Sequence, residues 1–529
     1  MLMKKQKKAR NQSKGLEFDI LLSLILVIIA IAFIYMLYNF NLIPKIWVLL
    51  GGALLFIIIA ILITLIFVKH PKSAIVIFRR VTTLLLVVVL GIGTFYVSTA
   101  KSGFANISGL DSTHSKISVI VDETSKIKSV KDLKGKKVGY QNGLDKGNAD
   151  FAKNKLKDES SSVKFVGQED YTTLANSLIN HEIDALIISD SQISSILEHV
   201  SGFPKYRNVT TYTRERKNTL QGSDKDLTKE VFTVYVSGLD DPGDPRQNLG
   251  SDVNMLLIID PIANRISMTS FPRDAYVPNA GANNQNDKLS HTGRYGIDAT
   301  VDSMQSFLGI KIDYYAKISF TSIIKIVDIL GGITVDVPLD FEEQDENRSF
   351  AEGDLIRLKK GVQELNGRQA LALARHRHSY VDQDISRNKA QQLVMKGIMK
   401  KVLSTKGISV IDQLFAALPD IVMTNMNNDQ ISSFAASELE SLKPWTLSSM
   451  TLYSGCFDTR ITASIPEFPV DTYLFSKDEI REVQEAYDGA THRLQMNKFN
   501  FDLQKLHTIA IPGDDDSNMK FVEDAISPH

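Results

Sequence analysis

Three long apolar runs dominate the first hundred residues of the chain. They cover roughly residues 18–40, 46–68 and 81–99, and each is close to the about 20 residues with which an α-helix crosses the hydrocarbon core of a bilayer. Asp19 lies at the edge of the first run, and the interiors of the runs carry no charge. The first run is too long for a cleavable signal peptide and lacks a small-residue cleavage site. The pattern predicts three membrane-spanning helices.

Lysine and arginine flank these runs unequally. The first loop carries only Lys45, whereas the N-terminus and the second loop are rich in basic residues, namely Lys4, Lys5, Lys7, Lys8, Arg10, Lys14, Lys69, Lys72, Arg79 and Arg80. Loops rich in positive charge stay in the cytoplasm. We therefore expect a cytoplasmic N-terminus and an extracellular location for everything after about residue 100.

From Lys116 to Tyr212, short apolar strands alternate with helices. KISVIVD, KKVGY, VKFV and IDALIIS have the pattern of strands, and residues 148–157 and 171–180 that of helices. This alternation favours a small α/β domain with a largely parallel sheet. The phrases DLKGKKVGY and LANSLINHEIDALIIS resemble one lobe of extracellular solute-binding proteins, and about 100 residues are too few for two lobes. We expect a structural or partner-binding role for this domain.

The polar, unpatterned residues 213–228 predict a linker, after which the strand EVFTVYVSGL opens a second domain. A net charge of -1 over 529 residues leaves no basic footprint for nucleic acid. Cys456 is the single cysteine, so the chain forms no internal disulfide and no cysteine-based zinc site.

The stretch RHRHSYVDQDISRNKAQ, residues 375–391, is the strongest candidate for chemistry. If LALA and the residues after it form a strand, Arg375 and Arg377 project from one face. A helix that begins near Asp384 or Ser386 places Arg387 and Gln391 one turn apart. Guanidinium groups bind phosphate oxygens in pairs and keep their charge. The pattern indicates a phosphate or pyrophosphate site, with a solvated polar turn as the alternative.

Three more charged residues adjoin strands of the second domain. Asp240 ends one predicted strand, Asp252 precedes another, and Arg273 follows a third. Two carboxylates could hold Mg²⁺, which completes its shell with phosphate and water. A metal and fixed cations together meet the needs of phosphoryl transfer. The alternative is that the acids cap turns and that Arg273 pairs with Asp274.

Six phrases follow one another in this domain, namely SGLD, LGSDVNMLLI, MTSFPRDAYV, DYYAKISFTSIIKIVDILGGITVDVP, GVQELNGRQALALARHRH and DQDISRNKAQQ. Through these phrases, the segment from Asp240 to about Leu403 resembles the LytR-CpsA-Psr family of cell-wall phosphotransferases. Three spans, an extra domain and then the catalytic domain look like the capsule-associated CpsA branch of streptococci and their relatives. The fold class implied is α/β, with three N-terminal transmembrane helices, a small α/β accessory domain and an α/β/α sandwich.

The resemblance also assigns roles to individual residues. Asp240 and Asp252 fall on the metal-binding acids of the family, Arg273, Arg375 and Arg377 on catalytic and pyrophosphate-binding arginines, and Arg387 and Gln391 on further pyrophosphate ligands. Lys288, in NDKLSHTGRYG, keeps a cationic role there and is grouped with the pyrophosphate-binding residues, while His291 and Arg294 make that rim more polar. His376 and His378 alternate with the arginines and should face away from them, in a structural role.

The domains expected are a cytoplasmic N-terminus (1–17), the three spans (18–100), an extracellular accessory domain with its linker (101–228), the catalytic domain (229–490) and a solvated tail (491–529). The activity implied is Mg²⁺-dependent transfer of a glycopolymer, such as capsular polysaccharide or a teichoic-acid-like polymer, from undecaprenyl pyrophosphate to peptidoglycan. The capsule-synthesis machinery and the lipid membrane are the other partners expected. The alternative is a non-catalytic protein that binds lipid-linked polysaccharide and regulates its synthesis or export.

Overall fold

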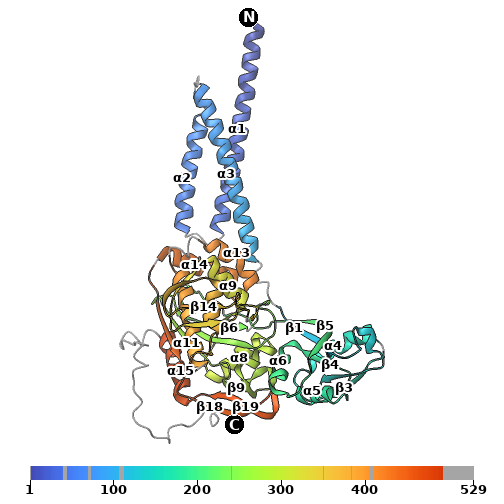
Figure 1. The fold of residues 1–529 in the computed structure, drawn as a ribbon. Coiled ribbons are helices and arrows are strands. Elements are labelled where there is room, and N and C mark those ends of the chain that lie inside the picture. Colours follow the sequence, from blue (N-terminus) through green and yellow to red (C-terminus); the bar gives the residue numbers. More distant parts are fainter. Residues whose placement is uncertain are drawn as a thin grey trace. The chain divides into compact units, whose positions relative to one another are not determined.

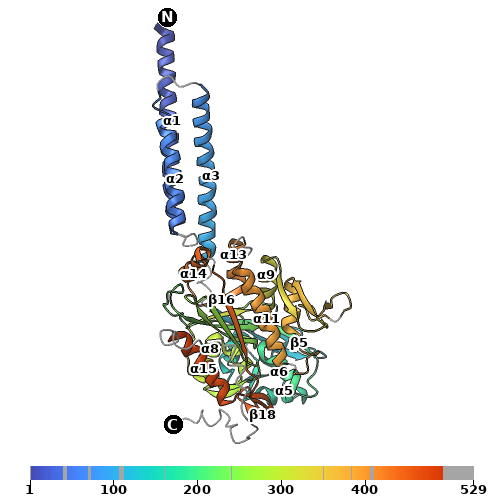
Figure 2. The same cartoon turned by 90° about the vertical axis from the view of Figure 1, so that its left-hand side faces the viewer.

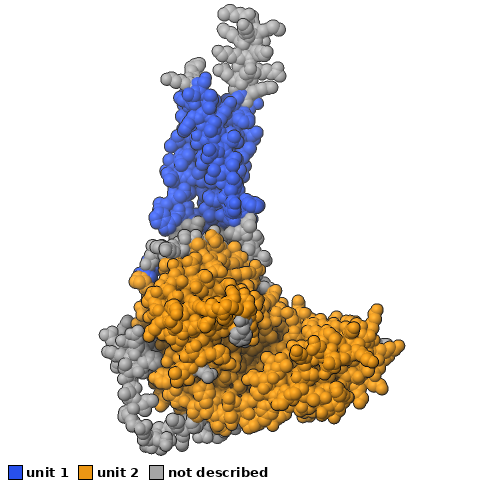
Figure 3. All heavy atoms as spheres, viewed as in Figure 1, with its two compact units in different colours: residues 1–107, 226–228, 427–443 blue, residues 108–225, 229–426, 444–529 orange. Residues whose placement is uncertain are grey.

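The computed structural model describes residues 2–39, 45–68, 73–105, 112–160, 162–239, 241–349, 351–382, 384–404, 410–441 and 443–492. Its residues form two compact units, coloured separately in Figure 3. One comprises residues 1–107, 226–228 and 427–443, and the other comprises residues 108–225, 229–426 and 444–529. Asp240 and the acidic tail after residue 492 lie outside the described residues.

The first unit is built on three long helices, α1 (Leu2–Tyr38), α2 (Lys45–Thr64) and α3 (Ser73–Ala105) (Figure 1). Their segments Gly15–Tyr38, Lys45–Thr64 and Ser73–Ser98 are long and apolar enough to cross a membrane, as the sequence predicts. Asp19 is buried and ion-paired with Arg79 and Arg80, so its charge is compensated inside the helix bundle. The unit also contains α14 (Asn428–Ser441).

The accessory domain is a five-stranded sheet in the order β3-β2-β4-β1-β5 with helices packed on it. Its elements are β1 (Ser112–Asp122), η1 (Val130–Leu133), β2 (Lys137–Gln141), α4 (Lys146–Glu159), β3 (Lys164–Gln168), α5 (Tyr171–Ile179), β4 (Ala185–Ser189), α6 (Asp190–His199) and β5 (Tyr206–Lys217). The predicted strands and helices are confirmed.

Two predictions for this region were wrong. The sheet is mixed, because β1 runs antiparallel to both β4 and β5, and only β3, β2 and β4 are parallel. Residues 213–217, expected in a linker, belong to β5 and pair with residues 112–116 of β1. This part of β5 lies at the edge of the sheet and is largely exposed. Its polar side chains therefore carry no apolar period that the sequence could reveal.

A six-stranded sheet in the order β16-β11-β6-β7-β8-β17 forms the centre of the second domain. Its strands are β6 (Phe232–Leu239), β7 (Ser251–Asp260), β8 (Arg265–Ser270), β11 (Tyr314–Ile318), β16 (Val422–Thr424) and β17 (Thr446–Thr451). The pairs β6–β11 and β8–β17 are parallel and the other pairs are antiparallel.

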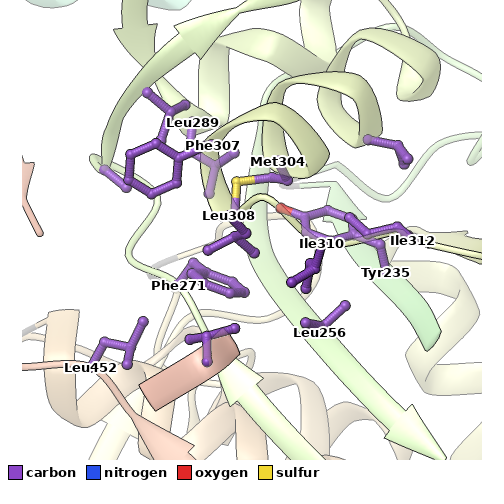
Figure 4. Close-up of a cluster of buried hydrophobic side chains, with 14 of the residues drawn as sticks. Tyr235, Leu256, Phe271, Leu289, Met304, Phe307, Leu308, Ile310, Ile312 and Leu452 are labelled. Atoms are coloured by element: carbon purple, nitrogen blue, oxygen red, sulfur yellow. The ribbon is translucent and has the colours of Figure 1, made fainter. Parts of the chain in front are cut away.

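Helices cover both faces of this sheet, which gives the α/β/α sandwich that the sequence predicts (Figure 2). On one face lie α8 (Ile297–Leu308) and α15 (Lys477–Thr491), and on the other lie α9 (Phe320–Ile329), α10 (Gly367–Arg375) and α11 (Asp384–Val402). The first face encloses a core that includes Tyr235, Leu256, Phe271 and Met304 (Figure 4).

Smaller elements complete the domain. Four two-stranded sheets pair β9 (Tyr276–Asn279) with β10 (Gln285–Lys288), β12 (Ile333–Val337) with β15 (Gly361–Leu365), β13 (Phe341–Glu343) with β14 (Ile356–Leu358), and β18 (Cys456–Thr462) with β19 (Ile465–Leu474). The short helices are η2 (Ala280–Ala282), α7 (Leu289–Thr292), η3 (Gly293–Tyr295) and α13 (Ile411–Ile421).

The strand expected before Arg375 is a helix. Asn366 caps α10 in a capping box, accepting a hydrogen bond from Gln369 N at 3.0 Å and donating one to Gln369 Oε1 at 3.0 Å. Ala370–Ala374 are all buried, and alternating Leu and Ala imitate a strand although both favour helix. Arg375 therefore ends a helix, and the shared strand face with Arg377 does not exist. The helix predicted from Asp384 is confirmed as α11.

Candidate active site

A cavity of about 200 Å³ lies where β7, α9, α10 and α11 meet. One part of its wall is charged or polar and includes Asp252, Arg273, Arg375, Arg377, Arg387 and Gln391. The remaining wall includes Val253, Phe320, Ile323, Leu371 and Ala374. A ligand that fits this cavity should therefore combine an anionic group with an apolar portion.

Asp252 is the acid at the centre of the charged wall. Its Oδ1 lies 3.1 Å from Arg273 Nη1, and its Oδ2 lies 3.7 Å from Arg387 Nη1. Burial alone would raise the pKa of Asp252, but the positive charges of Arg273 and Arg387 outweigh burial and hold the pKa below its usual value. In turn, Asp252 raises the pKa of Arg273. The carboxylate is therefore ionised at neutral pH.

Helix α11 brings a second acid to the arginines. Asp384 begins the helix, and its Oδ1 lies 2.9 Å from Arg387 Nη2 and 3.9 Å from Arg377 Nη1. The Arg387 side chain is 5% exposed, so its charge depends on these contacts. The Nε atoms of Arg273 and Arg387 have no hydrogen-bond partner among the described residues. Buried donors of this kind are available to an oxyanion.

Arg375 is held on two sides as it leaves α10. Its Nη1 donates to the backbone oxygen of Asp345 at 2.9 Å, and its guanidinium lies 4.7 Å from the centre of the Phe320 ring. Gln391 is anchored next to it, with Nε2 donating to the backbone oxygen of Ala374 at 3.3 Å. The two contacts of Arg375 fix the plane of the guanidinium, which favours paired contacts with phosphate oxygens.

The structure separates Lys288 from the residues with which it was grouped. Lys288 is absent from the described wall of the cavity, and its Nζ lies 2.9 Å from Asp274 Oδ1. Asp274 Oδ2 in turn lies 3.6 Å from Arg273 Nε. Lys288 thus acts on the site through Asp274.

His291 and Arg294 are also absent from the described wall of the cavity. His291 Nδ1 bonds to Asp287 Oδ1 at 2.8 Å. Arg294 donates to Gln192 and Ser195 of the accessory domain at 2.8 and 2.7 Å.

The two histidines differ in position. His376 is buried, with Nδ1 3.0 Å from Glu343 Oε2 and its ring stacked on Phe341 at 4.1 Å between centres. This confirms the structural role predicted for it. The expectation that His378 faces away from the arginines was wrong, because His378 lines the same cavity. The wrong strand assignment caused this error.

Sequence reasoning missed Phe320, Glu343, Gln344 and Arg348, which also line the cavity. The Glu343 carboxylate lies 3.0 Å from His376 Nδ1. Arg348 has a φ of 61° and sits in the turn after β13. A positive φ is unusual for a residue with a β-carbon, and such strain is found at functional sites. The sequence QDENRS shows only a polar turn, and Phe320 reads as an ordinary core residue, so neither gave a signal.

The acids of the site decide whether the cavity suits Mg²⁺. No group of three or more His, Cys, Asp or Glu side chains that could hold a metal occurs in the described part of the chain. Mg²⁺ nevertheless often binds through one or two carboxylates together with substrate phosphates. The Asp252 carboxylate fits that mode, provided that an anionic ligand offsets the charges of Arg273 and Arg387.

The accessory and second domains match different families. Residues 110–200 match the family described as NMT1/THI5 like, and residues 202–487 match the LytR_cpsA_psr family.

Individual relatives agree with the second match. The polyisoprenyl-teichoic acid–peptidoglycan teichoic acid transferase TagV of Bacillus subtilis is 29% identical over 296 residues, which are 53% of this chain and 71% of TagV. The corresponding TagU of Bacillus cereus is 30% identical over 231 residues, 44% of this chain and 72% of TagU. The crystal structure of B. subtilis TagV aligns with a TM-score of 0.42 and 25% identity, covering 50% of this chain and 98% of TagV. The match over residues 202–487 and the TagU relative place this chain in the LytR_cpsA_psr family.

Proposed function

We propose that this protein is a membrane-anchored transferase that moves a glycopolymer from a polyprenyl diphosphate carrier to peptidoglycan. The observation that carries the proposal is a single cavity lined by Asp252, by four arginines and by an apolar wall. The arginines are Arg273, Arg375, Arg377 and Arg387, of which Arg273 and Arg387 contact Asp252. A polyprenyl diphosphate has the two parts that such a cavity selects, an anion for the arginines and a hydrocarbon chain for the wall. The names of TagU and TagV, which describe teichoic acid transfer to peptidoglycan, support the same chemistry.

In the proposed reaction, a sugar hydroxyl of peptidoglycan attacks the phosphorus that carries the glycopolymer. A new P–O bond forms to the acceptor, the bond to the leaving polyprenyl phosphate breaks, and the hydroxyl proton passes to a base. Arg375 and Arg387, each fixed by a contact on this chain, hold the diphosphate and stabilise the charge that develops on it. The apolar wall excludes water, which strengthens these contacts.

Mg²⁺, when bound by Asp252 and the diphosphate, would neutralise charge on the leaving group. Asp252 would therefore promote diphosphate binding without contacting the diphosphate itself. It would hold Arg273 and Arg387 in place and provide an oxygen ligand for the metal. Asp240 is the second ligand that we propose. The role of Lys288 is to orient Arg273 through Asp274.

We further propose that the second and accessory domains lie on the outer face of the membrane, where peptidoglycan is found. The support is the excess of Lys and Arg before the first span, together with Lys69 and Lys72 between the second and third spans. Arg79 and Arg80, which were expected in the second loop, lie in α3 and pair with Asp19. Capsular polysaccharide carried on undecaprenyl pyrophosphate is the donor that we favour, as in the CpsA branch, and the capsule-synthesis machinery is the expected partner.

The test combines the full-length protein in detergent with a synthetic polyprenyl-diphosphate saccharide, peptidoglycan fragments and Mg²⁺. We expect a phosphodiester product by mass spectrometry, which Arg375→Ala reduces strongly. Binding of the donor without product, across several acceptors, would favour a non-catalytic regulator instead. Such a regulator could use the same arginines but would not need Asp252.

A further inference from the structure

Helix α11 borders a second pocket, a groove on the side of the helix opposite the arginine cavity. Arg387 and Gln391 line the cavity, whereas Ser386, Leu393 and Lys396 line a groove of about 450 Å³. At about 100° per residue, the two sets point in opposite directions from the helix axis. Strand β17 and Pro338 provide the other wall of this groove, which we call the α11–β17 groove.

Both charged residues that line the α11–β17 groove are lysines, Lys389 and Lys396. The acid Asp382 accepts a hydrogen bond from the lining Ser386 but is not itself a described lining residue. Lys396 Nζ donates to Ser449 Oγ at 2.7 Å, and neither lysine forms an ion pair with a described residue. Burial and the nearby Lys400 lower the pKa of Lys396, since no anion offsets its charge. An anionic ligand would supply the missing countercharge.

Two tyrosines add a different kind of contact. The Tyr380 side chain lines the groove and the residue is 8% exposed, yet its hydroxyl has no hydrogen-bond partner among the described residues. A buried hydroxyl without a partner is unfavourable, and a hydroxyl-rich ligand could satisfy it. Tyr453 is 57% exposed and offers an aromatic face to the apolar side of a sugar ring. The hydroxyl groups of Ser386, Ser449 and Thr451 also lie on the wall. They already bond to Asp382, Lys396 and Gln392, and a hydroxyl oxygen can still accept a further hydrogen bond.

We infer that the α11–β17 groove binds the anionic saccharide chain of the donor, beyond the sugar that is attached to the diphosphate. The inference rests on the proposed function, because it needs a donor whose diphosphate occupies the arginine cavity. A helix with its side chains is about 10–12 Å across, so a chain that passes around α11 needs only a few sugars to reach the groove. The two lysines then select a polymer with charged repeats over a neutral one.

The test uses the full-length protein in detergent and a synthetic phosphodiester-linked N-acetylglucosamine oligomer without lipid or diphosphate, with binding measured by calorimetry. The paired variant Lys389→Gln with Lys396→Gln should weaken binding at least roughly tenfold. Tyr380→Phe removes only the hydroxyl and should weaken binding severalfold without unfolding the protein. Lys401→Gln is the matched control, because Lys401 lies on α11 outside the groove and pairs with Glu364, so its loss removes a positive charge and should leave the affinity unchanged.

Other ligands separate this inference from the proposed function. A neutral dextran oligomer of equal length should bind much more weakly than the charged oligomer. Equal binding of the two oligomers would overturn the inference. So would unchanged affinity in the paired lysine variant, or binding of a muropeptide together with no binding of the charged oligomer. Loss of binding in the paired variant would support the groove even if the protein formed no transfer product, so the two proposals fail separately.

Discussion

Replacing Arg375 with alanine tests whether the cavity carries the chemistry. The change removes the hydrogen bond to the Asp345 backbone oxygen at 2.9 Å and the stacking on Phe320 at 4.7 Å. These contacts contribute about 1 kcal/mol and about 0.5–1 kcal/mol to stability. A domain stable by about 5–15 kcal/mol remains folded after their loss.

The expected loss of activity is larger than the loss of stability. A fixed cation that faces a developing oxyanion is worth roughly 2–4 kcal/mol at the transition state, which corresponds to a rate lower by roughly 10² to 10³. Arg375→Lys keeps the charge but not the planar pair of donors, and we expect it to lose about tenfold.

The assay follows product formation by mass spectrometry under subsaturating donor, which reports kcat/KM. Thermal unfolding of each variant provides the control for folding. Arg357→Ala is a matched surface control, because its ion-pair partners among the described residues are the exposed Glu342 and Glu352. Wild-type kcat/KM in Arg375→Ala, with the protein folded, would refute the assignment of the arginine cavity as the active site.

Three further predictions concern stability. The pKa of Asp252 is depressed in the folded protein. Its contribution to stability is therefore present above the unfolded pKa of about 3.9 and is lost as pH falls through the lower folded pKa. In Asp252→Asn, the stability measured by circular dichroism should consequently depend less on pH in this acid range. Burial and Asp170 raise the pKa of Glu467 to about 7, so the stability of the protein falls as pH rises from about 4.3 toward 7. Glu467→Gln should therefore raise the melting temperature at pH 8 but not at pH 4. An equal shift of the melting temperature at both pH values would contradict this linkage. Asn366→Ala breaks the capping box of α10 and should cost about 1 kcal/mol in urea unfolding, whereas Asn366→Asp should cost far less; equal losses would exclude the cap as the cause.

The sequence predicted the architecture where an apolar period was clear. The three spans, four strands of the accessory sheet and three strands of the second sheet were predicted from such patterns. Helix α11 was predicted from a cap at Asp384 or Ser386, and strands β5, β11, β16 and β17 were not predicted. Sequence reasoning failed where local patterns mislead: Leu371–Arg375 alternates like a strand but is a helix, and the charged end of β5 shows no period. The direction of β1 depends on its pairing with β4 and β5, which no local pattern specifies.

Some residues of the candidate site could be predicted from the sequence and others could not. Residues that carry charge beside predicted strands or in α11 could be named from the sequence, and Asp252, Arg273, Arg375, Arg377, Arg387 and Gln391 do share one cavity. Lys288 could not be placed correctly, because its ion pair with Asp274 depends on tertiary packing. Phe320 and Arg348 were missed because an apolar side chain and a turn residue carry no chemical signal of their own.

The most direct test of the account is transfer by the full-length protein from a polyprenyl-diphosphate saccharide to peptidoglycan fragments, with and without Mg²⁺, comparing wild type with Asp252→Ala and Arg375→Ala. The account predicts a phosphodiester-linked product that requires Mg²⁺ and is strongly reduced in both variants. Product formed at the wild-type rate by both folded variants would contradict it.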